Sequence, residues 1–151
     1  MDRYKLGKQN LDLFKHLCDE AGIKLTHQRL EILKELSISS DHPSVELIHT
    51  RLKERMPTIA IDTVYRTLAT FEQLGIVKKL HVANERTLLD TNLEIHHHFI
   101  CTRCKKINDI YWPDFDKSNL PDDIESLGRV HTRHLELHGV CIECLQDAEN
   151  K

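Results

Sequence analysis

The chain has 151 residues, of which 40% are hydrophobic and 30% are charged, and its formal net charge is −3. This length allows one large domain or two small ones. The sequence has no apolar run near the roughly 20 residues of a membrane-spanning helix, and its polar N-terminus is unlike a signal peptide. We therefore expect a cytoplasmic protein with no membrane partner.

Charge, histidine and cysteine are divided unevenly along the chain. Residues 1–90 hold fourteen Lys and Arg against thirteen Asp and Glu, a balance of +1, whereas residues 91–151 hold seven against eleven, a balance of −4. Six of the eleven histidines and four of the five cysteines lie in the second part. This asymmetry predicts two domains, 1–90 and 91–151, of which the second handles metal.

The first part reads as helices followed by a hairpin. Apolar residues recur at helical spacing in four segments, 10–21, 27–37, 45–56 and 62–74. Two alternating segments, 76–82 and 87–90, are joined by residues 83–86 and predict a hairpin. Cys18 and His49 fall on apolar helix faces, so we expect both to be core residues and not ligands.

This order of elements is typical of a winged helix-turn-helix domain, which lays one helix in the major groove of DNA. Thr63, Tyr65 and Arg66 are polar residues at the start of the fourth helix, where base edges and phosphates would be met. Phosphate contact needs a locally positive face, and this part of the chain is only weakly positive. An ordinary helical domain whose charged side chains face solvent therefore remains the alternative to DNA binding.

The second part reads as a small α/β unit, which makes the chain an α+β protein. We expect strands at 95–101 and 107–112, a loop at 113–119, a short helix at 121–127 and a long strand at 130–140. The last strand is the weakest of these predictions, because only Leu135 and Leu137 alternate cleanly in it.

Two cysteine pairs indicate a structural zinc site. Cys101 and Cys104 form one Cys-x-x-Cys pair, and Cys141 and Cys144 form another after thirty-six intervening residues. Four thiolates are the closed tetrahedral ligand set that structural zinc prefers, and each pair fits one tight turn. The alternatives are two disulfides or four buried thiols, although disulfides need an oxidising compartment.

Three consecutive histidines precede the first cysteine pair. Alternate side chains of a strand share a face, so His96 and His98 point one way and His97 the other. Two imidazoles on one face can bind one ion. A chance cluster of histidines on a solvated strand is the alternative.

Several motifs together resemble the ferric uptake regulator family of metal-dependent repressors. They are Leu25-Thr26-His27-Gln28-Arg29, Asp62-Thr63-Val64-Tyr65-Arg66-Thr67-Leu68, His96-His97-His98-Phe99-Ile100-Cys101 and both cysteine pairs. The resemblance runs from about residue 10 to about residue 145. It implies a winged-helix DNA-binding domain, a C-terminal dimerisation domain, and a homodimer that binds palindromic double-stranded operator DNA. It also implies DNA contacts by Tyr65 and Arg66, to which we add Thr63, at the same helix start, and the basic Arg29 as candidates.

The resemblance further implies a regulatory metal site that joins the two domains. Its ligands would be His42, Asp90, His96, His98 and Asp109. Nitrogen and carboxylate donors of this kind suit Fe(II) or Mn(II) and, less selectively, Zn(II). Alone, His42 reads as a turn residue before proline, and Asp90 and Asp109 read as surface carboxylates at strand ends.

The residue at position 109 indicates which branch of the family the chain resembles. Iron-sensing relatives usually carry glutamate at this position and peroxide-responsive relatives usually carry aspartate, so the chain is similar to the peroxide-responsive branch. That similarity implies that Fe(II) promotes oxidation of a ligand histidine, His42 or His96, by hydrogen peroxide, after which metal and DNA are released. Iron sensing is the alternative.

One metal site of the family is altered in this chain. Another family metal site would involve His97, Asp116 and residue 133, but residue 133 is an arginine, which cannot ligate. We expect this site to be absent, or rebuilt with His131 or His134.

A hydrolytic metal enzyme is the competing class of function, but we find no nucleophile pair, no general base and no glycine-rich phosphate loop. A zinc-carrying interaction module without DNA binding is a further alternative. We therefore expect no enzyme, and no small-molecule substrate beyond metal ion and peroxide.

Overall fold

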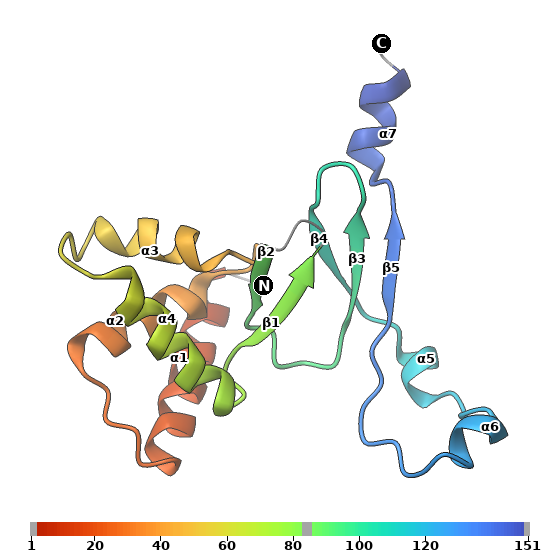
Figure 1. The fold of residues 1–151 in the computed structure, drawn as a ribbon, viewed down its shortest axis with the longest axis horizontal. Helices are drawn as coiled ribbons and strands as arrows, with labels where there is room; N and C mark the ends of the chain where they lie inside the picture. The colour runs from red at the N-terminus through yellow and green to blue at the C-terminus, as the bar shows by residue number, and fades with distance from the viewer. Residues whose placement is uncertain (1–2, 83–85, 150–151) are drawn as a thin grey trace. The chain divides into compact units, whose positions relative to one another are not determined.

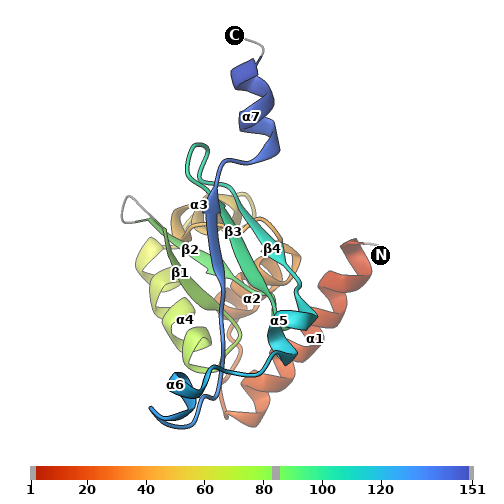
Figure 2. The same ribbon diagram turned by 90° about the vertical axis from the view of Figure 1, so that its right-hand side faces the viewer.

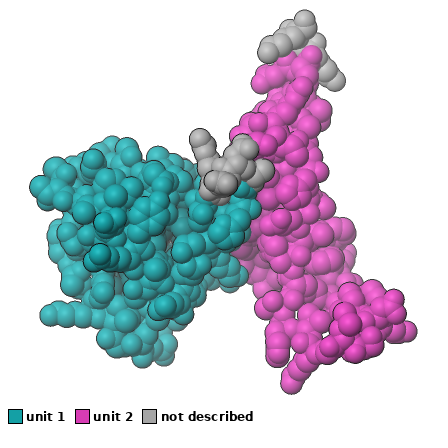
Figure 3. Space-filling view, in the orientation of Figure 1, with its two compact units in different colours: residues 1–93 teal, residues 94–151 magenta. Residues whose placement is uncertain are grey.

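The computed structural model describes residues 3–82 and 86–149. The chain forms two compact units, residues 1–93 and 94–151, which Figure 3 shows in different colours. No helix in the described part of the chain is both long and apolar enough to cross a membrane.

The described residues of unit 1 form four helices and a two-stranded hairpin (Figure 1). The elements are α1 (Arg3–Glu20), α2 (His27–Ile38), α3 (Val45–Lys53), α4 (Ile61–Gln73), β1 (Lys78–Val82) and β2 (Arg86–Asp90). The strands pair antiparallel, with Leu80 opposite Leu88. The four predicted helices and the hairpin strands are confirmed, although α1 starts earlier than expected. Of the predicted connection 83–86, residues 83–85 lie outside the described residues.

Helix starts in unit 1 follow local capping chemistry. The Thr26 side chain accepts a hydrogen bond from the backbone N–H of Arg29, and Ser44 accepts one from the N–H of Leu47. Each side-chain oxygen thus accepts a hydrogen bond from a backbone N–H that has no partner inside its own helix. Ser44 thereby sets the point at which the chain leaves the loop carrying His42 and enters α3.

The apolar core of unit 1 lies between its helices and the hairpin. Its fully buried side chains include Phe14, Cys18, Ile32, Leu33, Leu36, Ile48, Leu52, Leu68, Phe71, Ile76 and Leu89. Cys18 is therefore a core residue, as predicted, and burial raises the pKa of its thiol. His49 is half-buried and its Nε2 atom lies 2.9 Å from the carbonyl oxygen of Ile59, so it also has the structural role that we expected.

Unit 2 is built on a three-stranded sheet of β3 (His97–Cys101), β4 (Ile107–Ile110) and β5 (Glu136–Gly139). The central strand β3 pairs antiparallel with β4 and parallel with β5. Helices α5 (Pro113–Lys117) and α6 (Asp122–Glu125) lie between β4 and β5 in sequence. Helix α7 (Ile142–Glu149) continues beyond the end of β5 (Figure 2).

Two predictions for unit 2 were wrong, and one helix was not predicted. The expected loop at 113–119 contains helix α5, which begins with proline and carries Asp114 and Asp116 in its first turn, a favourable arrangement at a helix start. The expected strand at 130–140 is regular only at Glu136–Gly139. The polar residues before it are held by side-chain hydrogen bonds instead, such as those of Arg133. Helix α7 was not expected.

Candidate metal centres and nucleic-acid surface

Four cysteines of unit 2 converge. Cys101 ends β3, Cys104 lies in the following turn, Cys141 precedes α7 and Cys144 lies in its first turn. The Sγ atoms of Cys101 and Cys144 are 3.9 Å apart, those of Cys104 and Cys141 are 3.7 Å apart, and all four lie within 4.8 Å of one another. Sulfurs at about 2.3 Å from a tetrahedral zinc ion would be about 3.8 Å apart, so the cluster fits Zn(II).

These two separations are too long for disulfides, because bonded sulfurs lie about 2.05 Å apart. All five cysteines are free thiols. The backbone N–H of Cys141 donates to Sγ of Cys101 at 3.3 Å, and this lowers the pKa of the Cys101 thiol to about 6. Hydrogen bonding with Cys141 raises the pKa of Cys144 to about 12. Thiolates this close repel one another, so a divalent cation is what allows all four to ionise.

Two histidines and an aspartate form a second cluster in unit 2. The Nε2 atoms of His96 and His98 are 3.1 Å apart, and Oδ1 of Asp109 lies 3.8 Å and 3.6 Å from them. Asp109 is brought there by strand pairing, because it stands opposite His98 in the β3–β4 ladder. His97 points to the other side, where its ring packs against Phe115. The predicted alternation of the three histidines is therefore confirmed.

The hydrogen bonds around these imidazoles favour metal binding through Nε2. Nδ1 of His96 lies 2.7 Å from the carbonyl oxygen of Glu94, so Nδ1 carries the hydrogen and Nε2 keeps its lone pair. Nδ1 of His98 lies 3.2 Å from Nε2 of His134. Partners of this kind fix the orientation of ligand imidazoles. Desolvation lowers the pKa of His134, which favours the neutral form that can accept this hydrogen bond.

In unit 1, His42 and Asp90 lie near each other in a buried position. Nε2 of His42 is 4.0 Å from Oδ1 of Asp90, and the two residues are 8% and 3% exposed. The backbone N–H of Leu89 donates to the carbonyl oxygen of Pro43 at 2.9 Å, which fastens the loop carrying His42 to the strand that ends in Asp90. Asp90 also accepts a hydrogen bond from the N–H of Asn92 at 2.9 Å, which orients its carboxylate.

The predicted DNA contacts start from two helices of unit 1. Tyr65 and Arg66 are exposed on the first turns of α4, and Thr63 is half-buried beside them. Arg29 lies in α2, and its guanidinium donates to the carbonyl oxygen of Lys24 at 2.9 Å. Arg29 thus holds the segment that precedes α2 through this hydrogen bond.

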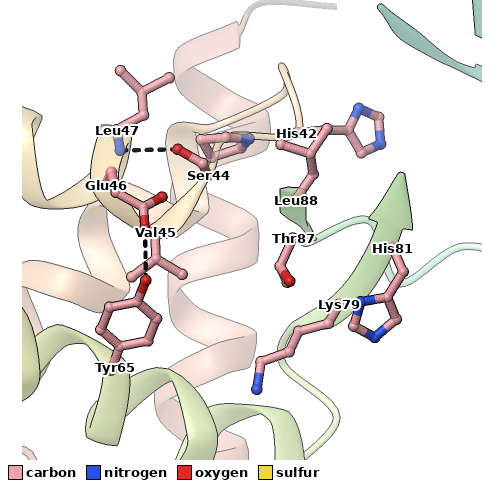
Figure 4. A pocket seen from close by; sticks show the side chains of 11 residues that line it. His42, Ser44, Val45, Glu46, Leu47, Tyr65, Lys79, His81, Thr87 and Leu88 are labelled. Atoms are coloured by element: carbon pink, nitrogen blue, oxygen red, sulfur yellow. Dashed lines mark hydrogen bonds between the residues drawn. The ribbon is translucent and has the colours of Figure 1, made fainter. Parts of the chain in front are cut away.

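Tyr65 lines a hollow of about 810 Å³ formed by the start of α3, by α4 and by the hairpin (Figure 4). Its phenol donates a hydrogen bond of 2.5 Å to Oε1 of Glu46, although Tyr65 is 45% exposed. This bond to Glu46 raises the pKa of Tyr65. Lys79 and Thr87, from the two hairpin strands, line the same hollow.

Comparison with known proteins decides the family. Residues 20–138 match the ferric uptake regulator family. The chain belongs to this family. The peroxide-responsive repressor PerR of Staphylococcus epidermidis is 34% identical over 129 residues, which cover 85% of each chain. The Helicobacter pylori ferric uptake regulator Fur has a TM-score of 0.75 at 23% identity over 96% of this chain and 97% of that one. PerR from Streptococcus pyogenes has a TM-score of 0.52 at 26% identity over 89% and 92%.

Membership in the ferric uptake regulator family confirms the resemblance predicted from the motifs and, with the structural neighbours, the predicted α+β fold class. It places the chain among metal-dependent repressors. The cluster of four cysteines agrees with the structural zinc expected for it.

At the altered metal position, His97 and Asp116 are in direct contact with each other. Nε2 of His97 lies 3.0 Å from Oδ1 of Asp116, and Nδ1 of His97 accepts the N–H of Leu135 at 3.2 Å. Arg133 donates to the carbonyl oxygens of Phe115 and Ser118. Both ring nitrogens of His97 are thus engaged. The His134 ring lies 6.0 Å from the His97 ring, but Nε2 of His134 makes its hydrogen-bond contact with His98.

His134 was predicted only as a substitute ligand for that altered site. Its contact with Nδ1 of His98 was missed, because the contact depends on the pairing of β3 with β5. The only sequence signal was a second histidine-rich stretch, His131 to His138, near the second cysteine pair.

Proposed function

We propose that the chain is a metal-dependent transcriptional repressor that binds palindromic double-stranded operator DNA as a homodimer and responds to hydrogen peroxide. In this proposal residues 1–90 bind DNA, and residues 91–151 dimerise and hold metal. The observation that carries the metal response is the trio of His96, His98 and Asp109, whose donor atoms lie within 3.8 Å of one another.

The two metal centres have separate roles in this proposal. Zn(II) is held by Cys101, Cys104, Cys141 and Cys144, and its role is structural. Four thiolates leave no open position for a reacting molecule, and a bound zinc ion stabilises a small unit strongly. The site joins the turn after β3 to the start of α7, which are distant in sequence.

The regulatory ion is Fe(II) or Mn(II), held by His42, Asp90, His96, His98 and Asp109. Imidazole nitrogens and carboxylate oxygens suit these borderline ions. His42 and Asp90 belong to unit 1, and the other three ligands belong to unit 2. An ion that takes ligands from both groups couples metal binding to the arrangement of the DNA-binding unit, and DNA affinity then depends on metal.

Peroxide sensing is supported by Asp109 and by the similarity to proteins named as peroxide-responsive repressors. Fe(II), when bound, would catalyse cleavage of the O–O bond of hydrogen peroxide, and the two electrons of the net reaction would come from the imidazole. In the net reaction a C–H bond of the His42 or His96 ring is replaced by a C–O bond, the displaced hydrogen stays on the side chain at a ring nitrogen or the new oxygen, the O–O bond breaks, and the other oxygen leaves as water. The imidazole is oxidised by two electrons. An oxidised ring is a poorer ligand, so metal affinity and DNA affinity fall together.

DNA recognition is assigned to the start of α4, with Thr63, Tyr65 and Arg66 at the groove and Arg29 on α2. Dimerisation is supported by the surface of unit 2. Leu137 of the edge strand β5 and Ile142 and Leu145 of α7 are 41%, 66% and 47% exposed. A second copy that covers them would remove this apolar area from water.

DNA binding is tested with a random duplex library and the zinc-loaded protein in Mn(II). We expect a palindromic sequence to be enriched, and we expect a chelator of Mn(II) to abolish binding to it in a gel shift. His96→Ala should abolish metal-dependent binding while keeping its zinc. The proposal fails if no sequence is enriched, or if His96→Ala binds as the wild type does.

Peroxide sensing is tested by peptide mass spectrometry of Fe(II)-loaded protein before and after hydrogen peroxide. We expect the mass of one oxygen atom on His42 or His96, and no such product with Mn(II). His16, exposed on α1, is the internal control, because diffuse oxidation would modify it too. An unmodified protein that still binds DNA in an Fe(II)-dependent way would instead identify the iron-responsive alternative.

A further inference from the structure

The backbone at His42 adopts a conformation that an isolated chain avoids. Its φ angle is +49°, in the left-handed region, and the next residue is proline. Side chains with a Cβ atom rarely adopt this region, and a following proline restricts the backbone further. Neighbouring contacts must therefore impose the conformation of His42.

One set of contacts comes from the hairpin side. The N–H of Leu89 donates to the carbonyl oxygen of Pro43, and Ser44 forms an isolated antiparallel bridge with Leu88. The Thr91 hydroxyl donates to the carbonyl oxygen of Ser39 at 3.2 Å. These contacts hold the two ends of the loop formed by residues 39–44, but none of them is made by Asp41.

Arg51 of α3 holds the middle of the loop. Its two terminal nitrogens donate to the two carboxylate oxygens of Asp41 at 2.6 Å and 3.4 Å, and one of them also lies 3.4 Å from the Ser39 hydroxyl. A guanidinium paired with both oxygens of a carboxylate fixes direction as well as distance. On its other side Arg51 lies 3.8 Å from the buried carboxylate of Glu35 in α2.

We propose that Arg51 is a positioning residue for the regulatory metal ligand His42. By holding Asp41 and Ser39, it keeps the adjacent His42 in its left-handed conformation and aims the imidazole before metal binds. The inference rests on the proposed function, because it concerns the same metal site. If the loop relaxed to an ordinary φ angle, the direction of the His42 side chain would change and the preformed ligand would be lost.

Arg55 provides a matched control within the same structure. It lies shortly after α3 and donates to Glu31 at 3.1 Å and to Glu35 at 3.0 Å, both on α2. It thus joins the same two helices through the same kind of ion pair, but these bonds run to α2 and not to the loop 39–44. Replacing Arg55 changes helix packing without releasing the loop, whereas replacing Arg51 does both.

The experiment measures Mn(II) affinity of the zinc-loaded full chain, by electron paramagnetic resonance of the free ion. We expect Arg51→Gln to bind Mn(II) about 10-fold more weakly, which is the scale on which supporting residues act on metal ligands. Arg55→Gln should stay within about 2-fold of the wild type. Asp41→Asn breaks the same contact from its other end, leaves Glu35 untouched, and should resemble Arg51→Gln.

A charge swap separates positioning from general stability. Asp41→Arg combined with Arg51→Asp restores an opposite-charge pair, and we expect it to recover part of the Mn(II) affinity that either single change loses. Thermal unfolding without Mn(II) is measured in parallel for every variant. The inference is overturned if Arg51→Gln and Asp41→Asn both bind Mn(II) as the wild type does, or if Arg55→Gln weakens binding as much as Arg51→Gln.

A further variant keeps this inference distinct from the proposed function. His42→Ala should weaken Mn(II) binding more than Arg51→Gln does. If His42→Ala binds Mn(II) as the wild type does, the assigned metal site itself is wrong. If His42→Ala weakens binding and Arg51→Gln does not, the metal site stands and only the positioning role of Arg51 is rejected.

Discussion

His97 and Asp116 form a pair in which Nε2 of a fully buried imidazole lies 3.0 Å from Oδ1 of a half-buried carboxylate. The pair joins β3 to α5, and the other ring nitrogen of His97 accepts the N–H of Leu135. It occupies a position where relatives of this chain were expected to hold metal. Both ring nitrogens of His97 have partners within the protein, on the opposite face from His96 and His98.

We expect the His97–Asp116 pair to contribute stability and not regulatory metal affinity. Asp116→Asn should lower the free energy of unfolding by about 1–3 kcal/mol, because it removes a charged acceptor from a buried donor. Urea denaturation of the zinc-loaded chain measures this. Mn(II) affinity should be unchanged, and a loss of bound metal per chain in Asp116→Asn would contradict the structural role.

The cluster of four cysteines should control the folding of unit 2. Cys104→Ser should lose zinc and most of the ordered structure of residues 94–151, because structural zinc contributes an apparent 10–16 kcal/mol, roughly, in small zinc modules. Zinc analysis and hydrogen exchange measure the two effects. Cys18→Ala is the matched control, because Cys18 lies in the core of unit 1. This variant should keep the zinc ion of unit 2. Normal exchange protection of unit 2 in zinc-free Cys104→Ser would refute this prediction.

The bond between Tyr65 and Glu46 should be energetically linked to operator binding. While the phenol donates to Glu46, it cannot donate the same hydrogen to a DNA phosphate. The carboxylate of Glu46 therefore determines whether Tyr65 can act as a hydrogen-bond donor to DNA. We expect Tyr65→Phe and Glu46→Gln to be non-additive, with a coupling of about 0.5–1.5 kcal/mol. Fluorescence anisotropy with the selected operator measures it. Additive losses would mean that the two side chains act independently on DNA.

The ion pairs of Glu31 should make the stability of unit 1 depend on acid. The Lys34 hydrogen bond lowers the pKa of Glu31, burial opposes this, and Arg55 lowers it further. A carboxyl group whose pKa is lower in the folded state stabilises that state above its ordinary pKa of about 4.3. This contribution is lost as pH falls through the folded-state pKa.

Glu31→Gln should therefore be less stable than the wild type at neutral pH, by about 1–3 kcal/mol, and the difference should shrink as pH falls below about 4. Urea denaturation of both proteins at each pH measures the difference, so that effects common to both, such as loss of zinc, cancel. Glu54→Gln changes an exposed carboxylate and is the control. A difference that stays constant with pH would rule out the ion pairs as its source.

Predictions that depended on neighbours in sequence held. The pairing of cysteines within each Cys-x-x-Cys motif and the alternation of His96, His97 and His98 follow from local geometry, because each involves residues a few positions apart. The caps that Thr26 and Ser44 provide are local in the same sense. Such patterns carry their structural meaning wherever they lie in a chain. The same is true of the helical spacing in unit 1, whose apolar residues form one core.

Only the tertiary structure revealed the contacts that support the metal ligands. Arg51 meets Asp41 because α3 folds back beside the loop, and His134 meets His98 because β5 pairs with β3. Residues 130–135 were assigned to a strand, but side-chain hydrogen bonds to α5 and its following loop determine their path. The sequence by itself determined which residues have the chemistry of ligands, because that property belongs to each side chain. Their orientation depends on long-range packing and on groups distant in sequence, so no local pattern encodes it.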